Sequence, residues 1–282
     1  MSNIPGNSVP APILAKRRRM LLMVAAPVLV VLLIIGGFVA IKANQSPAAA
    51  TGAPSVPAGA TMEASIKSIP AATFDAVGAG MGVKRLAAAT GTPLTAAGKP
   101  RVLYVGAEFC PYCAAERWAM AAALSRFGTF SRLGLTRSSA TDVHPNTATL
   151  SFHGATYTSD LLSFTGVELT TNIAKPGGTG YIPLDTLTAS DKQTDAALNK
   201  KGFIPFVDFG NKHVITGVSY DVSVLQGLNQ TQIITAIYDP KSEISQRVLG
   251  AANMMTASLC QLTHGQPADV CTASAVTAQK LP

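Results

Sequence analysis

Two cysteines three residues apart are the most reactive side-chain pair in this chain of 282 residues. They lie in the segment Cys110-Pro111-Tyr112-Cys113, which follows the mostly apolar residues 101–107. The β-branched and aromatic residues of that apolar run predict a buried strand, and the good helix formers after Pro111 predict a helix over residues 111–127. Pro111 suits a first helical turn, because its missing N–H would have no partner there. The dithiol is therefore predicted to open a helix that follows a strand.

A helix N-terminus favours thiolate chemistry at such a pair. Its unpaired N–H groups and the helix dipole stabilise an anion, so Cys110 is predicted to be an attacking thiolate. Cys113 lies one helical turn further in and would resolve the mixed disulfide that Cys110 forms. The alternative is that the same two sulfurs form an inert structural disulfide.

The other two cysteines, Cys260 and Cys271, flank a turn-rich segment. We expect a structural disulfide between them, which would stabilise the fold by about 3 kcal/mol in the chain-entropy model. The alternative is a second redox pair that relays electrons to Cys110 and Cys113. Nothing in the spacing of Cys260 and Cys271 would lower a thiol pKa. Four cysteines, an even number, suit an exported domain.

The beginning of the chain predicts a membrane anchor. Residues 1–19 form a tail that ends in four consecutive basic residues, and residues 20–41 are a run of 22 uncharged, mostly apolar residues. A helix of that length crosses a hydrocarbon core of about 30 Å. The basic cluster places the N-terminus in the cytoplasm and the rest of the chain outside it. A cleaved signal peptide is the alternative, although its apolar region would be shorter.

The remainder divides into a spacer and a folded part. Residues 42–60 are rich in Pro, Ala, Ser and Gly and predict an extended linker, and residues 61–282 are predicted to form the exported domain. Within that domain, residues 203–209 and 213–216 predict two strands joined by a tight turn. Pro205 interrupts the first of them and cannot donate to a strand ladder, so a special, cis proline is expected there.

These motifs together resemble the thioredoxin superfamily. The resemblance rests on a strand, the Ala-Glu-Phe-Cys-Pro-Tyr-Cys segment at residues 107–113, a helix, and Phe-Ile-Pro-Phe at residues 203–206. It implies an α/β, thioredoxin-like fold with a large insertion at roughly residues 135–201. It also implies that the proline strand packs against the dithiol and holds extended substrate. The expected site is catalytic Cys110 and Cys113 with substrate-binding Pro111, Tyr112, Ile204 and Pro205. With its anchor, spacer and two C-terminal cysteines, the chain resembles an uncharacterised family of membrane-anchored thioredoxin-like proteins of prokaryotes.

The chain departs from thioredoxin at two positions. Thioredoxin usually has a buried acid six residues before the first cysteine, where this chain has Tyr104. Deprotonation of Cys113 would then depend on water, Glu108 or another group. The Pro-Tyr dipeptide between the cysteines resembles that of glutaredoxins, but no glutathione-site signature accompanies it.

Composition narrows the candidate functions. Residues 16–19 carry four of the charges behind the net charge of +7, and no basic stripe with interleaved aromatics predicts a nucleic-acid partner. The four histidines show no clustering typical of metal ligands, so we expect neither a metal nor a cofactor, and copper delivery remains an alternative hypothesis.

The functional hypothesis is a membrane-anchored thiol–disulfide oxidoreductase acting on cysteines of exported proteins, with a redox partner in the membrane as a further candidate. The direction of exchange cannot be read from the motif, although the compartment and the dipeptide favour an oxidase or isomerase. The alternative from another class is a non-catalytic, thioredoxin-fold binding module of the cell envelope.

Overall fold

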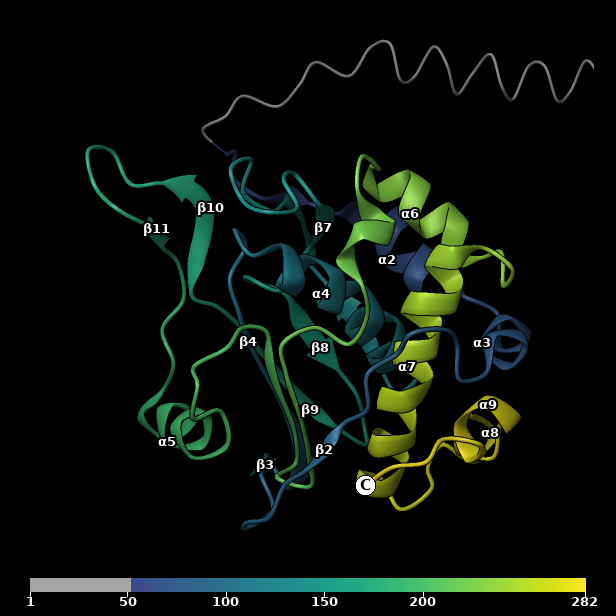
Figure 1. The fold of residues 1–282 in the computed structure, drawn as a ribbon. Helices are drawn as coiled ribbons and strands as arrows, with labels where there is room; N and C mark the ends of the chain where they lie inside the picture. The colour runs from purple at the N-terminus through teal and green to yellow at the C-terminus, as the bar shows by residue number, and fades with distance from the viewer. Residues whose placement is uncertain (1–51) are drawn as a thin grey trace, which may run out of the picture. The chain divides into compact units, whose positions relative to one another are not determined.

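A computed structural model describes residues 52–282, which form a mixed α/β unit (Figure 1). Four strands make the centre of its main sheet, in the spatial order β9 (Ser163–Glu168), β4 (Lys99–Gly106), β12 (Phe206–Phe209) and β13 (His213–Thr216). β4 runs parallel to β9 and antiparallel to β12, and β12 is antiparallel to β13. The strand before the dithiol is therefore an inner strand of the sheet.

Two short strands complete this sheet. β2 (Ala87–Ala88) pairs with β13, and β3 (Thr95–Ala96) pairs with the first residues of β4. The inner position of β4 explains its composition, because residues 102–105 are at most 1% exposed. A strand that is covered on both faces has a continuous apolar run instead of an alternating one.

Helices cover both faces of the sheet. On one face, α4 (Pro111–Leu124) and α7 (Glu243–Leu262) pack against each other, and Val102 and Tyr104 of β4 join their core. On the other face, Leu103 and Val105 belong to a smaller apolar cluster, against which Leu198 of α5 (Ala189–Leu198) packs. The alternation of β4 side chains between two clusters follows from the two-residue period of a strand.

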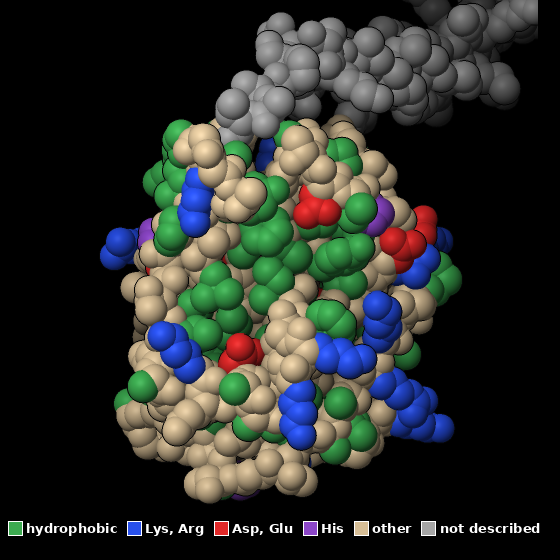
Figure 2. Space-filling model, turned by 60° about the vertical axis from the view of Figure 1, so that its left-hand side comes forward, with side chains coloured by type: hydrophobic (Ala, Val, Ile, Leu, Met, Phe, Trp, Pro, Cys, Tyr) green, Lys and Arg blue, Asp and Glu red, His purple; other side chains and the backbone are tan. Residues whose placement is uncertain are grey.

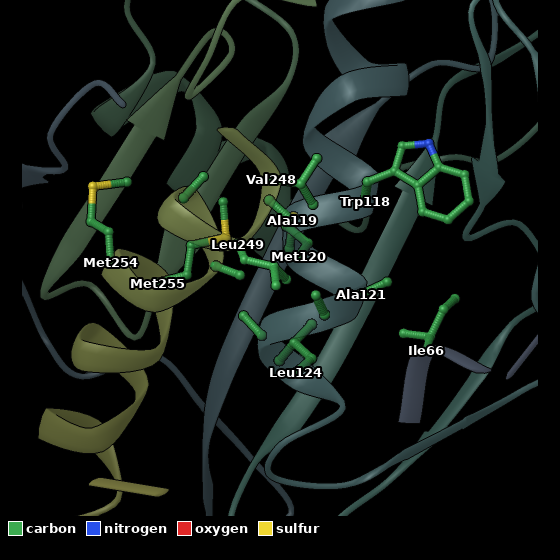
Figure 3. Packing of buried hydrophobic residues seen from close by; sticks show 14 of the residues in the cluster. Ile66, Trp118, Ala119, Met120, Ala121, Leu124, Val248, Leu249, Met254 and Met255 are labelled. Atoms are coloured by element: carbon green, nitrogen blue, oxygen red, sulfur yellow. The ribbon is translucent and has the colours of Figure 1, made fainter. Parts of the chain in front are cut away.

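The packing of α4 against α7 depends on small side chains. Every residue of α4 except Tyr112 is buried, and alanines make up much of the helix. Figure 3 shows Met120 of α4 beside Leu249 of α7, whereas Trp118 projects from the other side of α4, away from α7. Alanines stabilise a helix and let a second helix approach closely, which places α4 deep in the unit.

Smaller elements surround this centre. Three further strand groups pair antiparallel: β1 (Val56–Pro57) with β6 (Gly134–Arg137) and β7 (Ala148–Ser151); β5 (Thr129–Ser131) with β8 (Thr156–Thr158); and β10 (Thr170–Ala174) with β11 (Tyr181–Pro183). The remaining helices are α2 (Gly59–Lys67), α3 (Ala71–Val77), the 3-10 helix η1 (Val222–Leu225), α6 (Gln230–Ile237), α8 (Ala268–Cys271) and α9 (Ser274–Thr277).

Several sequence predictions are confirmed. The strand predicted at residues 101–107 is β4, the helix predicted at residues 111–127 is α4, and the strand predicted at 213–216 is β13. The strand predicted from residue 203 begins only at Phe206, directly after the cis bond between Ile204 and Pro205. The proline supplies no N–H for the ladder, so regular pairing starts one residue later.

Two predicted boundaries differ from the structure. The predicted linker, residues 42–60, includes β1, whose Val56 and Pro57 pair with Leu135 and Gly134, and the start of α2 at Gly59. The predicted insertion, residues 135–201, includes β9, which is the parallel neighbour of β4 and so belongs to the main sheet. The sequence alone did not single out this strand, because its pattern resembles that of the other short extended segments around it.

The predicted cytoplasmic tail, residues 1–19, and the predicted membrane helix, residues 20–41, lie outside the described residues. Within residues 52–282, no helix combines the length and apolar character needed to cross a membrane.

Leu249 tests the packing of α7 against α4. Leu249→Ala removes a side chain with 0% exposure and leaves a cavity, so we expect the free energy of unfolding to fall by roughly 3 kcal/mol. Urea unfolding followed by the fluorescence of Trp118, the single tryptophan, measures this change. The control Met81→Ala alters a side chain that is 52% exposed and should change stability by less than about 0.5 kcal/mol. Equal losses in the two variants would contradict a buried contact of Leu249 with α4.

Candidate active site

The dithiol caps the N-terminus of α4. Cys110 is the N-cap residue, and its Sγ accepts a hydrogen bond from the backbone N–H of Cys113 at 3.3 Å. Pro111 follows at the first helical position, as the sequence predicted. Cys110 is 4% exposed and Cys113 is 0% exposed, and both carry free thiols. A sulfur in the N-cap position satisfies one of the helix donors that would otherwise have no partner.

The two thiols differ in acidity. The pKa of Cys110 is lowered, chiefly by the hydrogen bond between its sulfur and the Cys113 side chain, against the opposing effect of burial. The backbone N–H of Cys113 and the charge of Arg117 lower the pKa of Cys110 further. Burial raises the pKa of Cys113 well above its ordinary value. Cys110 is therefore the thiol that ionises first, and Cys113 stays protonated beneath it.

The cis proline lies next to this pair. The carbonyl oxygen of Ile204 is 3.8 Å from Cys110 Sγ, and the peptide bond from Ile204 to Pro205 is cis. Pro205 is buried and Ile204 is half-buried. The carbonyl oxygen of Pro205 accepts a hydrogen bond from the N–H of Gly217, and this bond fixes the segment at the start of β12. The predicted site residues from the two halves of the chain thus meet at one place.

Apolar side chains surround the dithiol at the surface. Five large hydrophobic side chains are exposed within residues 52–282. Three of them lie on segments at or near the dithiol: Tyr112 at 38%, Val143 at 67% and Phe203 at 52%. The rings of Tyr112 and His144 meet edge to face, 6.0 Å apart. Hydrophobic side chains also gather in the middle of the molecular face drawn in Figure 2. We call Tyr112, Val143 and Phe203 the apolar rim of the site.

The hairpin formed by β10 and β11 supports the loop before the dithiol. Phe109 stacks on Tyr181 of β11 with ring centroids 4.3 Å apart, and the N–H of Glu108 donates to the Thr170 carbonyl at 2.9 Å. Tyr181 in turn donates from its hydroxyl to Ser139 at 2.7 Å. These contacts fix the position of residues 107–109, which connect β4 to Cys110.

A fully buried ion pair lies behind the dithiol, and the sequence analysis did not identify it. Arg117 follows Cys113 by four residues, so both side chains lie on one face of α4. Its Nε donates to Glu168 Oε1 at 2.7 Å, and its Nη2 donates to Glu168 Oε2 at 2.6 Å and to the Ala107 carbonyl at 2.7 Å. Both side chains are 0% exposed. The available signal was the pair of adjacent charged residues Glu116 and Arg117 in an otherwise largely apolar helix, about one turn after the second cysteine.

Tyr104 occupies the position where the resemblance would place a buried acid. Its ring packs edge to face on Phe152, with the two centroids 5.0 Å apart, and burial raises its pKa well above the ordinary value. The phenol is therefore neutral and cannot replace a carboxylate as a base near neutral pH. Its hydroxyl extends over Gly106, where any Cβ would overlap it, so a residue without a side chain is needed there. Glu108, the predicted alternative, is 1% exposed, and its Oε1 has no hydrogen-bond partner.

A second buried acid connects α4 to the other side of the site. Glu116 is 0% exposed and accepts hydrogen bonds from the backbone N–H of Ser219 at 2.8 Å and from the Ser219 hydroxyl at 2.7 Å. Burial raises its pKa to about 7, against the opposing effect of those two hydrogen bonds. Glu116 thus ties α4 to the segment that follows β13.

Cys260 and Cys271 form a disulfide between the last turn of α7 and α8, as predicted. This disulfide lies away from the dithiol. Leu262, which is close to the disulfide in sequence, packs against Gly210, directly after the end of β12. The Ile204–Pro205 bond, beside Cys110, precedes the start of the same strand. The two cysteine pairs therefore lie at opposite ends of β12, which does not allow direct exchange between them.

Within the part of the chain that the structure describes, no three His, Cys, Asp or Glu side chains gather as a metal site. The residues there that could hold a soft metal are the two free thiols of the dithiol itself.

Comparison with known proteins gives one match. A family model described as a domain of unknown function, DUF929, matches residues 85–179, about a third of the chain. The matched part includes β4, the dithiol, α4 and β9, but not Pro205 or α7. No curated protein and no solved structure matches the chain.

Glu116 should make stability depend on pH. Its folded pKa of about 7 exceeds the ordinary value of 4.5, so its contribution is fully present below pH 4.5 and is lost as the pH rises through 7. The loss amounts to about 3 kcal/mol. Glu116→Gln should flatten this decline in urea unfolding at several pH values, whereas Glu243→Gln, at a side chain that is 59% exposed, should not. Part of the decline should persist, because burial also raises the pKa of Asp208 to about 6.

The C-terminal disulfide should stabilise the fold without taking part in exchange. A variant with both Cys260→Ser and Cys271→Ser should lose about 3 kcal/mol of unfolding free energy in the chain-entropy model. The rate at which iodoacetamide alkylates Cys110 should stay that of the unaltered chain, because the two pairs do not touch. A changed Cys110 rate in the folded variant would instead favour a redox relay between the pairs.

Proposed function

We propose that this chain is a thiol–disulfide oxidoreductase of the thioredoxin superfamily that acts on cysteines of exported proteins. The observation that carries the proposal is the geometry of Cys110. Its sulfur caps α4, accepts the Cys113 N–H at 3.3 Å and lies 3.8 Å from the carbonyl before a cis proline. The lowered pKa of Cys110 suits a nucleophilic thiol, because the thiolate is the attacking form. Cys113, buried with a raised pKa, suits a resolving thiol that attacks only after the mixed disulfide has formed.

The topology around the site also supports the superfamily. The strand before the dithiol has one parallel neighbour, β9, and one antiparallel neighbour, β12, which begins after the cis proline. α4 and α7 cover one face of this sheet, and α5 covers the other. The resemblance implies a dithiol that opens the first central helix and a proline strand beside it, and this arrangement fits both expectations.

The proposed reaction has two steps. The Cys110 thiolate attacks one sulfur of a substrate disulfide, the substrate S–S bond breaks, and a mixed disulfide forms while the other substrate sulfur leaves as a thiolate. Cys113 then loses its proton to water and attacks Cys110 Sγ, which releases the second substrate thiolate. The substrate has gained two electrons, and Cys110 and Cys113 have become a disulfide. The same steps in reverse oxidise a substrate dithiol.

The apolar rim suits an unfolded or extended substrate. Tyr112 and Phe203 expose large apolar surfaces on the two segments that bring Cys110 and Pro205 together. Unfolded exported chains expose apolar residues around their cysteines, whereas folded ones bury them. We further propose that residues 20–41 anchor this domain outside the cytoplasm, on the length of that segment and its basic N-terminal flank.

Trapping of a mixed disulfide tests the reaction. Cys113→Ser leaves Cys110 unable to resolve its adduct, so cells that express this variant should accumulate mixed disulfides that dithiothreitol releases. Cys110→Ser is the matched control and should accumulate none, because the buried Cys113 is not the attacking thiol.

A non-catalytic binding module would trap no partner through either cysteine. If the reduced protein instead bound copper at one ion per chain through the two thiols, metal delivery would replace the redox function. The equilibrium of the dithiol with glutathione would then assign the direction of exchange.

A further inference from the structure

The ion pair between Arg117 and Glu168 has no role in the two-step exchange proposed for Cys110 and Cys113. Both of its side chains are nevertheless at 0% exposure. Burying two charges costs several kcal/mol per ion before their attraction offsets it, and apolar residues of similar size would often serve stability as well. A buried pair beside a reactive thiol therefore suggests an electrostatic task in addition to packing.

Arg117, the positive member of this pair, lies on the same helix as the dithiol. Arg117 lies one turn beyond Cys113 on the same face of α4, and its Nη2 donates to the carbonyl of Ala107 in the loop that leads to Cys110. Its Nη1 has no hydrogen-bond partner, so one face of the guanidinium remains available to a nearby negative charge. Glu168 approaches from the last position of β9, opposite Gly106, and holds the guanidinium with two bonds.

We propose that Arg117 is a positioning residue for thiol–disulfide exchange: held by Glu168, its guanidinium stabilises the thiolate form of the dithiol and thereby makes the Cys110–Cys113 disulfide a stronger oxidant. This inference rests on the proposed function. In this proposal the pair of Arg117 and Glu168 sets the reduction potential of the Cys110–Cys113 couple.

The remaining charges near the dithiol fit this assignment. Arg117 lowers the pKa of both cysteines, and its influence on Cys113 is larger than the opposing influence of Glu168. Tyr104 faces the pair from β4 and is neutral, because burial raises its pKa. Glu108 is a further acid near Glu168, and Asp185 accepts a hydrogen bond from the Glu168 N–H at 3.1 Å. Arg117 is the cation among these groups.

The ionisation of the pair follows from its bonds. Burial alone would lower the pKa of Arg117, but Glu168 raises it well above the ordinary value. Burial raises the pKa of Glu168, and the two short bonds from Arg117 oppose that rise. Both groups are charged, because a neutral carboxylic acid would leave the guanidinium buried without a counter-charge.

The test uses the sign of two opposite substitutions in the full chain. With the protein reduced, iodoacetamide alkylation at a fixed pH below the pKa of Cys110 is followed by mass spectrometry of the peptide that contains this residue. Arg117→Met should slow alkylation of Cys110 about tenfold, because a cation that favours the thiolate is lost. Glu168→Gln keeps the shape of the side chain and removes the opposing charge, so it should speed alkylation. Arg117→Lys keeps the charge and should stay close to the unaltered chain.

A matched control separates charge from packing. Arg126, just beyond the other end of α4, lies 4.4 Å above the Phe74 ring and donates to Asn253, but is far along the helix from Cys110. Arg126→Met should destabilise the fold without changing the alkylation rate. A general loss of structure would move Arg117→Met and Glu168→Gln in the same direction, and that result would overturn the proposal. So would an unchanged rate in both variants. If Arg117→Met does not fold, the comparison uses Glu168→Gln, which should be faster than the unaltered chain, and Arg117→Lys, which should match it. Equal slowing of alkylation in these two variants overturns the proposal.

The equilibrium with glutathione gives an independent readout. Arg117→Met should shift the equilibrium constant toward the disulfide form about tenfold, which is about 30 mV for this two-electron couple. Alkylation reports the thiolate alone. The electrostatic proposal can therefore fail while exchange with substrates stands, and exchange can fail while the thiolate of Cys110 still depends on Arg117.

Discussion

The position of α4 is the constraint on which the rest of this site depends. The helix is buried along its whole length except at Tyr112, and its first turn lies against the end of the sheet. Backbone N–H groups at such a buried helix end need an acceptor, since water cannot supply one freely. Cys110 supplies it with its sulfur, as Ser or Asp would with oxygen at other helices. The same contact that completes the helix also stabilises the thiolate. The lowered pKa of Cys110 thus follows in part from helix capping, beside the larger effect of the hydrogen bond with the Cys113 side chain.

Burial of the dithiol creates an electrostatic problem that the surrounding residues resolve. Removal from water raises the pKa of Cys113 and opposes ionisation of Cys110. A buried cation offsets this effect, but a lone guanidinium in the interior would itself be unstable. Glu168 of β9 supplies the counter-charge that stabilises the buried Arg117. The parallel strand beside β4 therefore both completes the sheet and holds this cation in place. A strand, a helix and a loop carbonyl, from Ala107, meet in this one group of contacts.

Local sequence was sufficient to predict the elements that carry the dithiol. Residues 102–105 predicted β4 because a strand buried on both faces needs an uninterrupted apolar run, and Pro111 together with the alanines predicted α4. Pro205 was found as an anomaly in a strand pattern. The role of residues 163–168 as the neighbour of β4 was not predictable in this way. Which extended segment pairs with which is decided by non-local contacts, and those contacts also join Glu168 to Arg117. Val56 and Pro57 had the composition of a spacer, and only their pairing with β6 includes them in the fold.

The candidate site and the C-terminal disulfide lie at opposite ends of β12. At one end the cis proline meets Cys110, and beyond the other end the disulfide between Cys260 and Cys271 closes the C-terminal helices. Stability can therefore be adjusted at one end without changing the acidity of the dithiol at the other. The acidity itself bears on the direction of exchange. Whatever stabilises the Cys110 thiolate stabilises the reduced form, and a more stable reduced form makes the disulfide the stronger oxidant. The helix cap and the Arg117 charge both act in that sense, so the proposed enzyme is better suited to forming disulfides in its substrates than to reducing them.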